Sequence, residues 1–225
     1  MGSQQKSSAG GGVAVFDLDG TLTFHDTLMP FLLGFALRHP ARLARGWRLA
    51  PALAGYARTR DRGVLKSRVI RLAMGGARRE EISAYAADYV RRLEPRGALR
   101  AGALATVQAH RAAGDHLILL SASPDLYVPR IGEHLSFERT LCTEVAWDGD
   151  TLNGDLRTPN RRGTEKVRCL EWLRTQYPGA PIVAYGNSES DLPHMRLADR
   201  AVLVNASRRA RRLGAELGIA TADWK

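Results

Sequence analysis

Two aspartates separated by a single residue are the first feature of the chain that suggests chemistry. Asp17 and Asp19 follow the apolar run 13–16 (VAVF), which has the composition of a buried strand. Because side chains alternate along an extended backbone, the two carboxylates would lie close together on one side. Such a pair repels unless a cation lies between them, and Mg²⁺ is the divalent cation that carboxylates hold together with a substrate phosphate. The pair therefore predicts metal-assisted chemistry on a phosphorylated compound.

Thr21 follows the same apolar run as the aspartates, and polar side chains also follow other apolar runs of strand length. The latter are Ser121, Ser123, Asn187, Ser188 and Asp191. In an open sheet of parallel strands, ligands bind beyond the carboxyl ends of the strands, so we expect these groups to meet the aspartate pair at one edge. An isolated Asp-x-Asp pair is more often a polar turn or a helix cap. The matching residues at other strand ends favour a metal and phosphate site instead.

The elements that must position these residues alternate along the chain. Short apolar runs, typical of buried parallel strands, occupy residues 13–16, 116–121, 180–186 and 201–205. Apolar residues at spacings of three and four predict helices at 98–114, 124–135, 164–177 and 207–218. The alternation predicts an α/β fold, a doubly wound (Rossmann-like) parallel sheet covered by helices.

Two segments interrupt this alternation. Residues 27–95 carry only helical signals, and one apolar face within 78–93 consists of Ile82, Tyr85, Ala86, Tyr89 and Leu93. We expect an all-helical cap domain here, inserted after the first strand, with 13–26 and 96–225 as the α/β core. Residues 143–157 contain the turn signals Asp148-Gly149 and Asn153-Gly154 and predict a β-hairpin flap within the core. Residues 1–12 have the composition of a flexible tail.

Composition restricts the class of protein. The 225 residues are 44% hydrophobic and 25% charged, which is typical of a globular domain. No apolar stretch reaches the length of about 18 residues that a transmembrane helix needs. Cys142 and Cys169 have no metal-binding spacing and indicate reduced thiols. We therefore expect a cytoplasmic protein, with peripheral attachment to the inner membrane as the alternative.

The charge of the chain favours an anionic partner, because its net charge is +10. Arg38–Arg71 holds ten Arg or Lys residues and one acid, Asp61. Apolar residues of the same region are Phe31, Leu32, Leu33, Phe35, Trp47, Leu49 and Leu53. One interpretation is a helical cap in which the apolar residues are buried and the basic residues are exposed to solvent, and we favour it. The alternative is a basic amphipathic surface that binds anionic lipid. A nucleic-acid partner is disfavoured, since the chain has no RNP-type aromatic motif, zinc spacing or helix-turn-helix signature.

Four short stretches resemble the motifs of one family in their expected order. FDLDGT (16–21) resembles the first motif of the haloacid dehalogenase superfamily of phosphatases, and LILLSAS (117–123), GTEKV (163–167) and YGNSESD (185–191) are similar to the next three. The helical segment looks like the family's type-one cap and the hairpin like its flap. Within the superfamily the chain is most similar to the phosphoserine phosphatase-like branch, subfamily IB. FDLDGTLTFHDTL, SASPDLYV and PNRRGTEKV resemble bacterial members that include a phosphatidylglycerophosphate phosphatase (phosphatidylglycerophosphatase C-like).

The resemblance implies a phosphomonoester hydrolase with a covalent aspartyl-phosphate intermediate. Asp17 would be the nucleophile, and Asp19 would protonate the leaving group and then activate water. Members that dehalogenate, or that hold the phosphoenzyme for ion pumping, lack an acid two residues after the nucleophile. Asp19 therefore favours hydrolysis of a phosphomonoester over dehalogenation. Ser121 would donate a hydrogen bond to a phosphoryl oxygen, and Lys166 would neutralise developing charge.

The resemblance also implies Mg²⁺ as the cofactor. Its ligands would be the Asp17 carboxylate, the backbone carbonyl of Asp19 and the side-chain oxygen of Asn187, where the commoner pattern has Asp. Because the Asn187 oxygen is neutral, Asp191 would carry more of the charge, as a ligand or as support for the ligands.

The cap is expected to decide the substrate. Asp26 lies nine residues after Asp17, where phosphoserine phosphatases place a Glu that reads an ammonium group. Further candidate substrate contacts are Thr21, His25, Lys66, Arg68 and Ser123. Two substrates stay open: a lipid headgroup phosphate such as phosphatidylglycerophosphate, or a small phosphometabolite such as phosphoserine. A non-catalytic, basic nucleic-acid-binding protein with a relict pocket is a third alternative.

Overall fold

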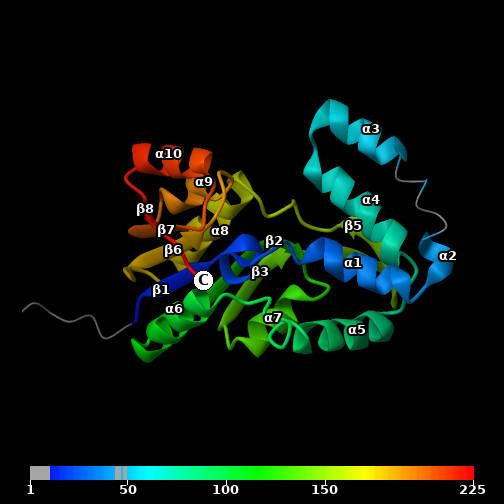
Figure 1. The fold of residues 1–225 in the computed structure, drawn as a ribbon, viewed down its shortest axis with the longest axis horizontal. Coiled ribbons are helices and arrows are strands. Elements are labelled where there is room, and N and C mark those ends of the chain that lie inside the picture. The colour runs from blue at the N-terminus through cyan, green and yellow to red at the C-terminus, as the bar shows by residue number, and fades with distance from the viewer. Residues whose placement is uncertain (1–10, 44–46, 48–49) are drawn as a thin grey trace, which may run out of the picture.

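A computed structural model describes residues 11–43, 47 and 50–225 of the chain. Residues 1–10 of the expected tail, and Leu49 of the expected amphipathic surface, lie outside the described residues. Within this part of the chain, a parallel sheet of six strands has the order β3-β2-β1-β6-β7-β8 (Figure 1). The strands are β1 (Val13–Phe16), β2 (His116–Pro124), β3 (Arg139–Thr143), β6 (Ile182–Gly186), β7 (Arg200–Val204) and β8 (Ala220–Ala222). The predicted doubly wound α/β fold is confirmed.

Helices cover both faces of this sheet. They are α6 (Ala101–Ala112), α7 (Val128–His134), α8 (Thr164–Gln176), α9 (Leu192–Met195) and α10 (Arg208–Glu216). Ala14 and Phe16 of β1 share a buried cluster with α6 and α7, whereas Val13 and Val15 pack in a cluster with α8. Strand β1 is thus buried on both faces and pairs with β2 and β6, so its carboxyl end lies at the centre of the sheet edge.

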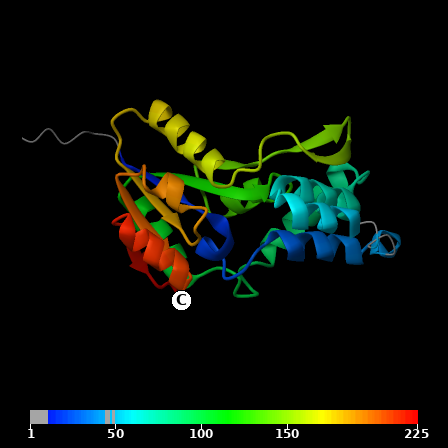
Figure 2. The same cartoon turned by 90° about the horizontal axis from the view of Figure 1, so that it is seen from above.

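A helical insert, whose helices lie between Leu28 and Arg91, follows the first strand and lies beyond one end of the sheet (Figures 1 and 2). Its helices are α1 (Leu28–Leu37), α2 (Pro40–Leu43), α3 (Ala50–Thr59), α4 (Arg62–Met74) and α5 (Arg79–Arg91). The apolar face predicted within 78–93 is buried, against apolar residues of α1 and α4. The boundaries of a cap domain stay a prediction. Among the described residues, no helix combines the length and the apolar character needed to span a bilayer.

A β-hairpin of β4 (Val145–Asp148) and β5 (Thr151–Leu156) lies within the predicted flap segment. Asp148-Gly149 is at its turn, as predicted. The second predicted turn is wrong, because Asn153-Gly154 lies inside β5. Gly154 has φ 93° and approaches α4 so closely that a Cβ atom would lie 2.8 Å from the Cα atom of Arg71. The hairpin therefore rests on the helical insert, and it also shares backbone hydrogen bonds with residues 76–79.

Candidate active site

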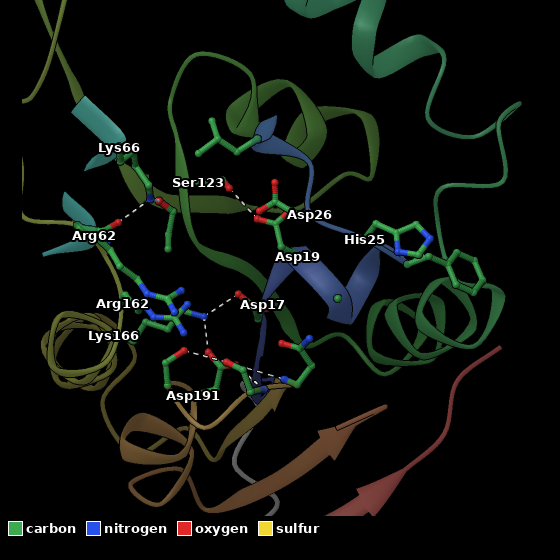
Figure 3. A pocket seen from close by; sticks show the side chains of 18 residues that line it. Asp17, Asp19, His25, Asp26, Arg62, Lys66, Ser123, Arg162, Lys166 and Asp191 are labelled. Carbon is green, nitrogen blue, oxygen red and sulfur yellow. Dashed lines mark hydrogen bonds and ion pairs between the residues drawn. The ribbon is translucent and has the colours of Figure 1, made fainter. Parts of the chain in front are cut away.

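The carboxyl end of β1 leads into a tight turn that holds the two aspartates. Asp17 and Asp19 keep extended backbone angles, but the chain turns at Gly20, where φ is 82°. A Cβ atom at Gly20 would lie only 2.0 Å from Nδ2 of Asn187, so glycine is needed both for the angle and for the space. Both carboxylates line a cavity of about 440 Å³ (Figure 3). Leu18, between the two aspartates, has helical backbone angles, so the extended continuation expected from the sequence ends at Asp17.

Lys166 connects two carboxylates at the base of this cavity. Its Nζ atom lies 2.6 Å from Oδ1 of Asp17 and 2.7 Å from Oδ1 of Asp191, as Figure 3 shows. All three side chains are buried, and that of Lys166 is 3% exposed. The hydroxyl of Thr21 donates a hydrogen bond of 3.1 Å to the other Asp17 oxygen. One ammonium group thus balances one of two buried carboxylates, and a negative charge is left over.

The pKa values of these groups reflect that imbalance. Burial is the largest influence on Asp17 and raises its pKa to about 7, although Lys166 acts in the opposite direction. Burial would also raise the pKa of Asp191, but the Lys166 ammonium and the Ser188 hydroxyl outweigh it and hold that pKa below its usual range. Burial opposes the charge of Lys166, yet its two carboxylate neighbours keep its pKa above the ordinary value. Asp17 is therefore the carboxyl that would gain most from a bound cation.

Asp19 is held in a different environment from Asp17. Its Oδ1 atom accepts hydrogen bonds from the backbone N–H and the hydroxyl of Thr27, at 2.7 and 2.6 Å. Its Oδ2 atom accepts one from the Ser123 hydroxyl at 2.6 Å. The Tyr127 hydroxyl lies 2.8 Å from that of Thr27 and fixes it in turn. Burial raises the pKa of Asp19, although these hydrogen bonds oppose the shift. Asp19 is thus a rigidly oriented carboxyl group with an increased tendency to hold a proton.

The loop after β6 adds an amide and a carboxylate to the site. Oδ2 of Asp191 accepts hydrogen bonds from the backbone N–H groups of Asn187 and Ser188 and from the Ser188 hydroxyl. The Asn187 side chain also lines the cavity, and it has no hydrogen-bond partner among the described residues. The same residues contain no group of three or more His, Cys, Asp or Glu side chains placed to hold a metal. A cation here would depend on few carboxylates together with amide and backbone oxygens, which suits Mg²⁺.

The helical insert contributes the opposite wall. Lys66 on α4 donates hydrogen bonds of 2.6 Å to the Ala122 carbonyl and to Oδ1 of Asn160. Burial is the main reason why the pKa of Lys66 is lowered to about 8, since nearby carboxylates only partly oppose it. His25 and Asp26 line the cavity as well, and Asp26 accepts a hydrogen bond from the backbone N–H of Met29.

Lys66 makes a pH dependence testable. Below about pH 8 the charged ammonium group would attract an anionic substrate, and above that pH it would lose its proton and this attraction. We expect KM for a phosphomonoester to rise as the pH increases through 8. In Lys66→Met, KM should already be high at neutral pH and should show no further rise, as steady-state kinetics from pH 6.5 to 9.5 would reveal. If KM of this variant rose with pH as much as that of the wild type, the pH dependence would belong to another group.

The cavity gathers most of the residues selected from sequence. The selected residues that line it are Asp17, Asp19, His25, Asp26, Lys66, Ser123, Lys166, Asn187, Ser188 and Asp191. Thr21 and Ser121 are fully buried beneath it; Ser121 accepts a hydrogen bond from the Ser123 N–H. Arg68 is exposed and lies outside the cavity, because two residues along α4 turn it about 200° away from Lys66.

Sequence reasoning missed other residues of the cavity wall. They are Phe24, Leu28, Arg62, Asn160, Arg162 and Ser190. Arg162 lies four residues before Lys166 in the stretch PNRRGTEKV, and this closeness in sequence was the available signal. Arg62 offered none, since it is one of many arginines in the basic segment 38–71.

Comparisons with known proteins identify chains of similar sequence and similar fold. A family model described as haloacid dehalogenase-like hydrolase matches residues 14–196. Protein CicA of Caulobacter vibrioides (strain NA1000 / CB15N) is 32% identical over 193 residues, which cover 83% of each chain. A protein with unknown function from Bordetella pertussis Tohama I has a similar fold, with a TM-score of 0.79 at 21% identity over 95% of this chain and 99% of that one. A phospho-aspartyl intermediate analogue of phosphoserine phosphatase gives a TM-score of 0.62 at 16% identity, over 90% of both chains.

Proposed function

Because the chain belongs to the haloacid dehalogenase-like hydrolases, we propose that it is a Mg²⁺-dependent phosphomonoester hydrolase that works through an aspartyl-phosphate. One observation carries the proposal: two carboxyl groups, Asp17 and Asp19, line one cavity in different environments. Asp17 is held by a lysine, as a nucleophile requires, and Asp19 is fixed by neutral donors, as a proton carrier requires.

The reaction follows from these two environments. An oxygen of Asp17 attacks phosphorus, and the bond between phosphorus and the leaving oxygen breaks. Asp19 gives its proton to that oxygen, so the alcohol leaves neutral. Water then attacks the phosphorus of the aspartyl-phosphate and loses a proton to Asp19, which frees phosphate and Asp17. Lys166 neutralises negative charge throughout, in a buried position where its effect is large.

The residues present fit Mg²⁺. Asp17 has a raised pKa and needs positive charge, and the Asn187 amide faces the cavity without a partner among the described residues. We propose that Asp17, the backbone carbonyl of Asp19 and the Asn187 side chain hold the metal. Asp191 is already hydrogen-bonded to Lys166 and Ser188, so we propose that it holds the loop after β6 in place and does not bind the metal directly. When bound, Mg²⁺ would supply the positive charge that draws a phosphoryl group toward Asp17.

Phosphate release from an aryl phosphate tests the proposal. We expect turnover with Mg²⁺, its loss in EDTA, and its return when Mg²⁺ is added in excess. Calorimetric titration of the protein with Mg²⁺ should give one binding site, independently of activity, and that binding should weaken in Asn187→Ala. A protein that binds no Mg²⁺ and releases no phosphate from aryl or alkyl phosphates would refute the proposal.

The substrate has two candidate classes, and one observation favours the lipid. Met29, Leu33 and Leu37 lie four residues apart along α1 and are 55%, 54% and 60% exposed. The opposite face of α1 is buried in the helical insert, as the sequence predicted for a packed cap. Helix α1 therefore has one buried apolar face and one exposed apolar stripe. Beside the arginine-rich segment 38–71, this stripe favours a lipid phosphate at an anionic membrane over a small phosphometabolite.

Co-sedimentation with vesicles tests the lipid candidate. We expect the protein to sediment with anionic vesicles and much less with zwitterionic ones. Leu33→Asp should reduce the bound fraction, because it places a negative charge in the stripe. Equal recovery in the supernatant with both kinds of vesicle would leave the small phosphometabolite as the substrate class.

A further inference from the structure

The two carboxyl oxygens of Asp19 are held on different sides of the chain. Its Oδ1 atom accepts hydrogen bonds from the backbone N–H and from the hydroxyl of Thr27, and these two bonds use both of its lone pairs. Its Oδ2 atom accepts one, from the Ser123 hydroxyl, and keeps a lone pair within the part of the chain that the structure describes. Ser123 lines the cavity that holds Asp17 (Figure 3), whereas Thr27 lines a separate hollow of about 180 Å³. A proton carried by Asp19 therefore belongs on Oδ2, on the side of the cavity.

The direction of the hydrogen bonds around Thr27 follows from the number of protons. The Thr27 hydroxyl has one proton and donates it to Oδ1 of Asp19 at 2.6 Å. The Tyr127 hydroxyl, 2.8 Å from the Thr27 oxygen, must then be the donor between these two groups. Because Oδ1 accepts whether or not Oδ2 carries a proton, this chain of two hydroxyls stays the same when Asp19 gains or loses its proton.

Tyr127 is held firmly beside Thr27. It directly precedes α7 and is fully buried, and its ring lies 4.4 Å from that of Phe31 and 5.7 Å from that of Tyr89, between ring centroids. The Tyr89 hydroxyl donates a hydrogen bond of 3.0 Å to the Thr27 carbonyl and fixes the other partner. A phenylalanine would fill the same apolar space, and a buried hydroxyl costs free energy unless it is bonded. The hydroxyl of Tyr127 therefore indicates a task other than packing.

The phenol of Tyr127 keeps the proton that it donates. Burial is the main reason why its pKa lies well above the ordinary value, and the charge of Asp19 acts in the same direction. Hydrogen bonding to Ser123 and Thr27 only partly opposes this shift. Tyr127 is thus a permanent donor next to the group that orients Asp19.

We propose that Tyr127 is a positioning residue for proton transfer and acts on Asp19 through Thr27. A hydroxyl that accepts a hydrogen bond is itself a stronger donor, so Tyr127 strengthens the bond from Thr27 to Oδ1 and fixes the plane of the carboxyl group. Oδ2 is then aimed at the leaving oxygen of the substrate without sampling other rotamers. This inference rests on the proposed phosphatase activity and adds to it a residue that acts on the reaction only through its neighbours.

Two substrates with different leaving groups test Tyr127→Phe, which removes only the hydroxyl. Their kcat/KM values cover the steps up to departure of the leaving group and exclude the later hydrolysis of the aspartyl-phosphate. With phenyl phosphate, whose leaving oxygen needs a proton, we expect kcat/KM to fall about tenfold, the effect of one lost hydrogen bond. With dinitrophenyl phosphate, whose leaving group departs as an anion, the fall should be less than about twofold. An equal fall with both substrates would mean a merely structural role and would overturn the proposal.

Variants of Thr27 connect this effect to the chain of hydroxyls. Thr27→Val keeps the branched shape and the backbone N–H but removes the hydroxyl, so the same selective loss with phenyl phosphate is expected. Thr27→Ser keeps the hydroxyl and should keep the wild-type ratio of kcat/KM between the two substrates. When Tyr127→Phe is added to Thr27→Val, the loss should not grow, because the bond through which Tyr127 acts is already absent. Losses that multiply in the double variant would refute the route through Thr27.

Tyr85→Phe is the matched control. Tyr85 is buried in the same aromatic cluster, where its ring contacts that of Phe31, but its hydroxyl donates to the Phe31 carbonyl. Its loss should leave the ratio of kcat/KM between the two substrates unchanged. A selective loss as large as that of Tyr127→Phe would show that any buried hydroxyl of this cluster has the effect, which would also overturn the proposal.

An NMR measurement separates this inference from the proposed function. The signal of the Asp19 carboxyl carbon, assigned with Asp19→Asn protein, does not depend on turnover. It should shift in Tyr127→Phe and in Thr27→Val but not in Tyr85→Phe. If the wild type hydrolyses neither substrate, the proposed activity fails, while these shifts would still support the chain of hydroxyls. Hydrolysis of both substrates by the wild type, with an unchanged Asp19 signal in Tyr127→Phe, would leave the phosphatase and remove Tyr127 from its role.

Discussion

Replacing Asp17 by asparagine is expected to lower kcat by roughly ten-thousandfold or more, the scale seen when a covalent nucleophile is removed. The amide keeps the shape of the carboxyl group but cannot attack phosphorus. Lys166 keeps Asp191 as its partner, so its ammonium is not left unpaired and the fold should persist. Phosphate release from an aryl phosphate, with circular dichroism as the measure of folding, checks this result.

Asp19→Asn is the informative comparison, because it should be severely impaired for a different reason. Asp17 would still be phosphorylated by a substrate with a good leaving group, which departs without a proton. We therefore expect a burst of one aryl alcohol per active site followed by slow phosphate release, whereas Asp17→Asn should show no burst. A burst in folded Asp17→Asn protein would exclude Asp17 as the nucleophile.

Replacing Lys166 by methionine is expected to affect both activity and stability. Asp17 and Asp191 would lose their shared cation in a buried site, which costs about 3–5 kcal/mol of unfolding free energy. Without the ammonium, kcat should fall by roughly a hundredfold to a thousandfold, as when one preorganised electrostatic group is removed. Urea unfolding at pH 8 and aryl phosphate kinetics measure the two effects.

Arg168→Met provides the control for this variant. Arg168 lies on the same helix and pairs with Glu165, but its side chain is exposed. Its loss should change the unfolding free energy by less than about 1 kcal/mol, as for other surface ion pairs, and should leave kcat unaltered. A wild-type urea midpoint in Lys166→Met would show that the buried ion pairs add nothing to stability.

Strands and helices were predictable where the local pattern is strong. The runs at 13–16 and 116–121 match β1 and the start of β2, because strands buried on both faces are apolar at every position. Strands β3 and β8 were missed, since they lie at the edges of the sheet and are partly exposed. The Asn153-Gly154 turn was mispredicted because that dipeptide supplies the positive φ of a close approach to α4 rather than a reversal of the chain.

The sequence by itself determined the family, the fold class and the identity of the aspartate pair as site residues. Motif order and apolar periodicity are properties of short segments of the chain and need no tertiary contacts to be recognised. Tertiary structure decided which groups face one another. It placed Lys166 between Asp17 and Asp191, closed the hydrogen bonds around Asp19, left the Asn187 amide open to the cavity, and joined Arg62 to Arg162 from segments 100 residues apart. Such pairings depend on how segments far apart in the sequence pack against one another, and no local pattern contains that information.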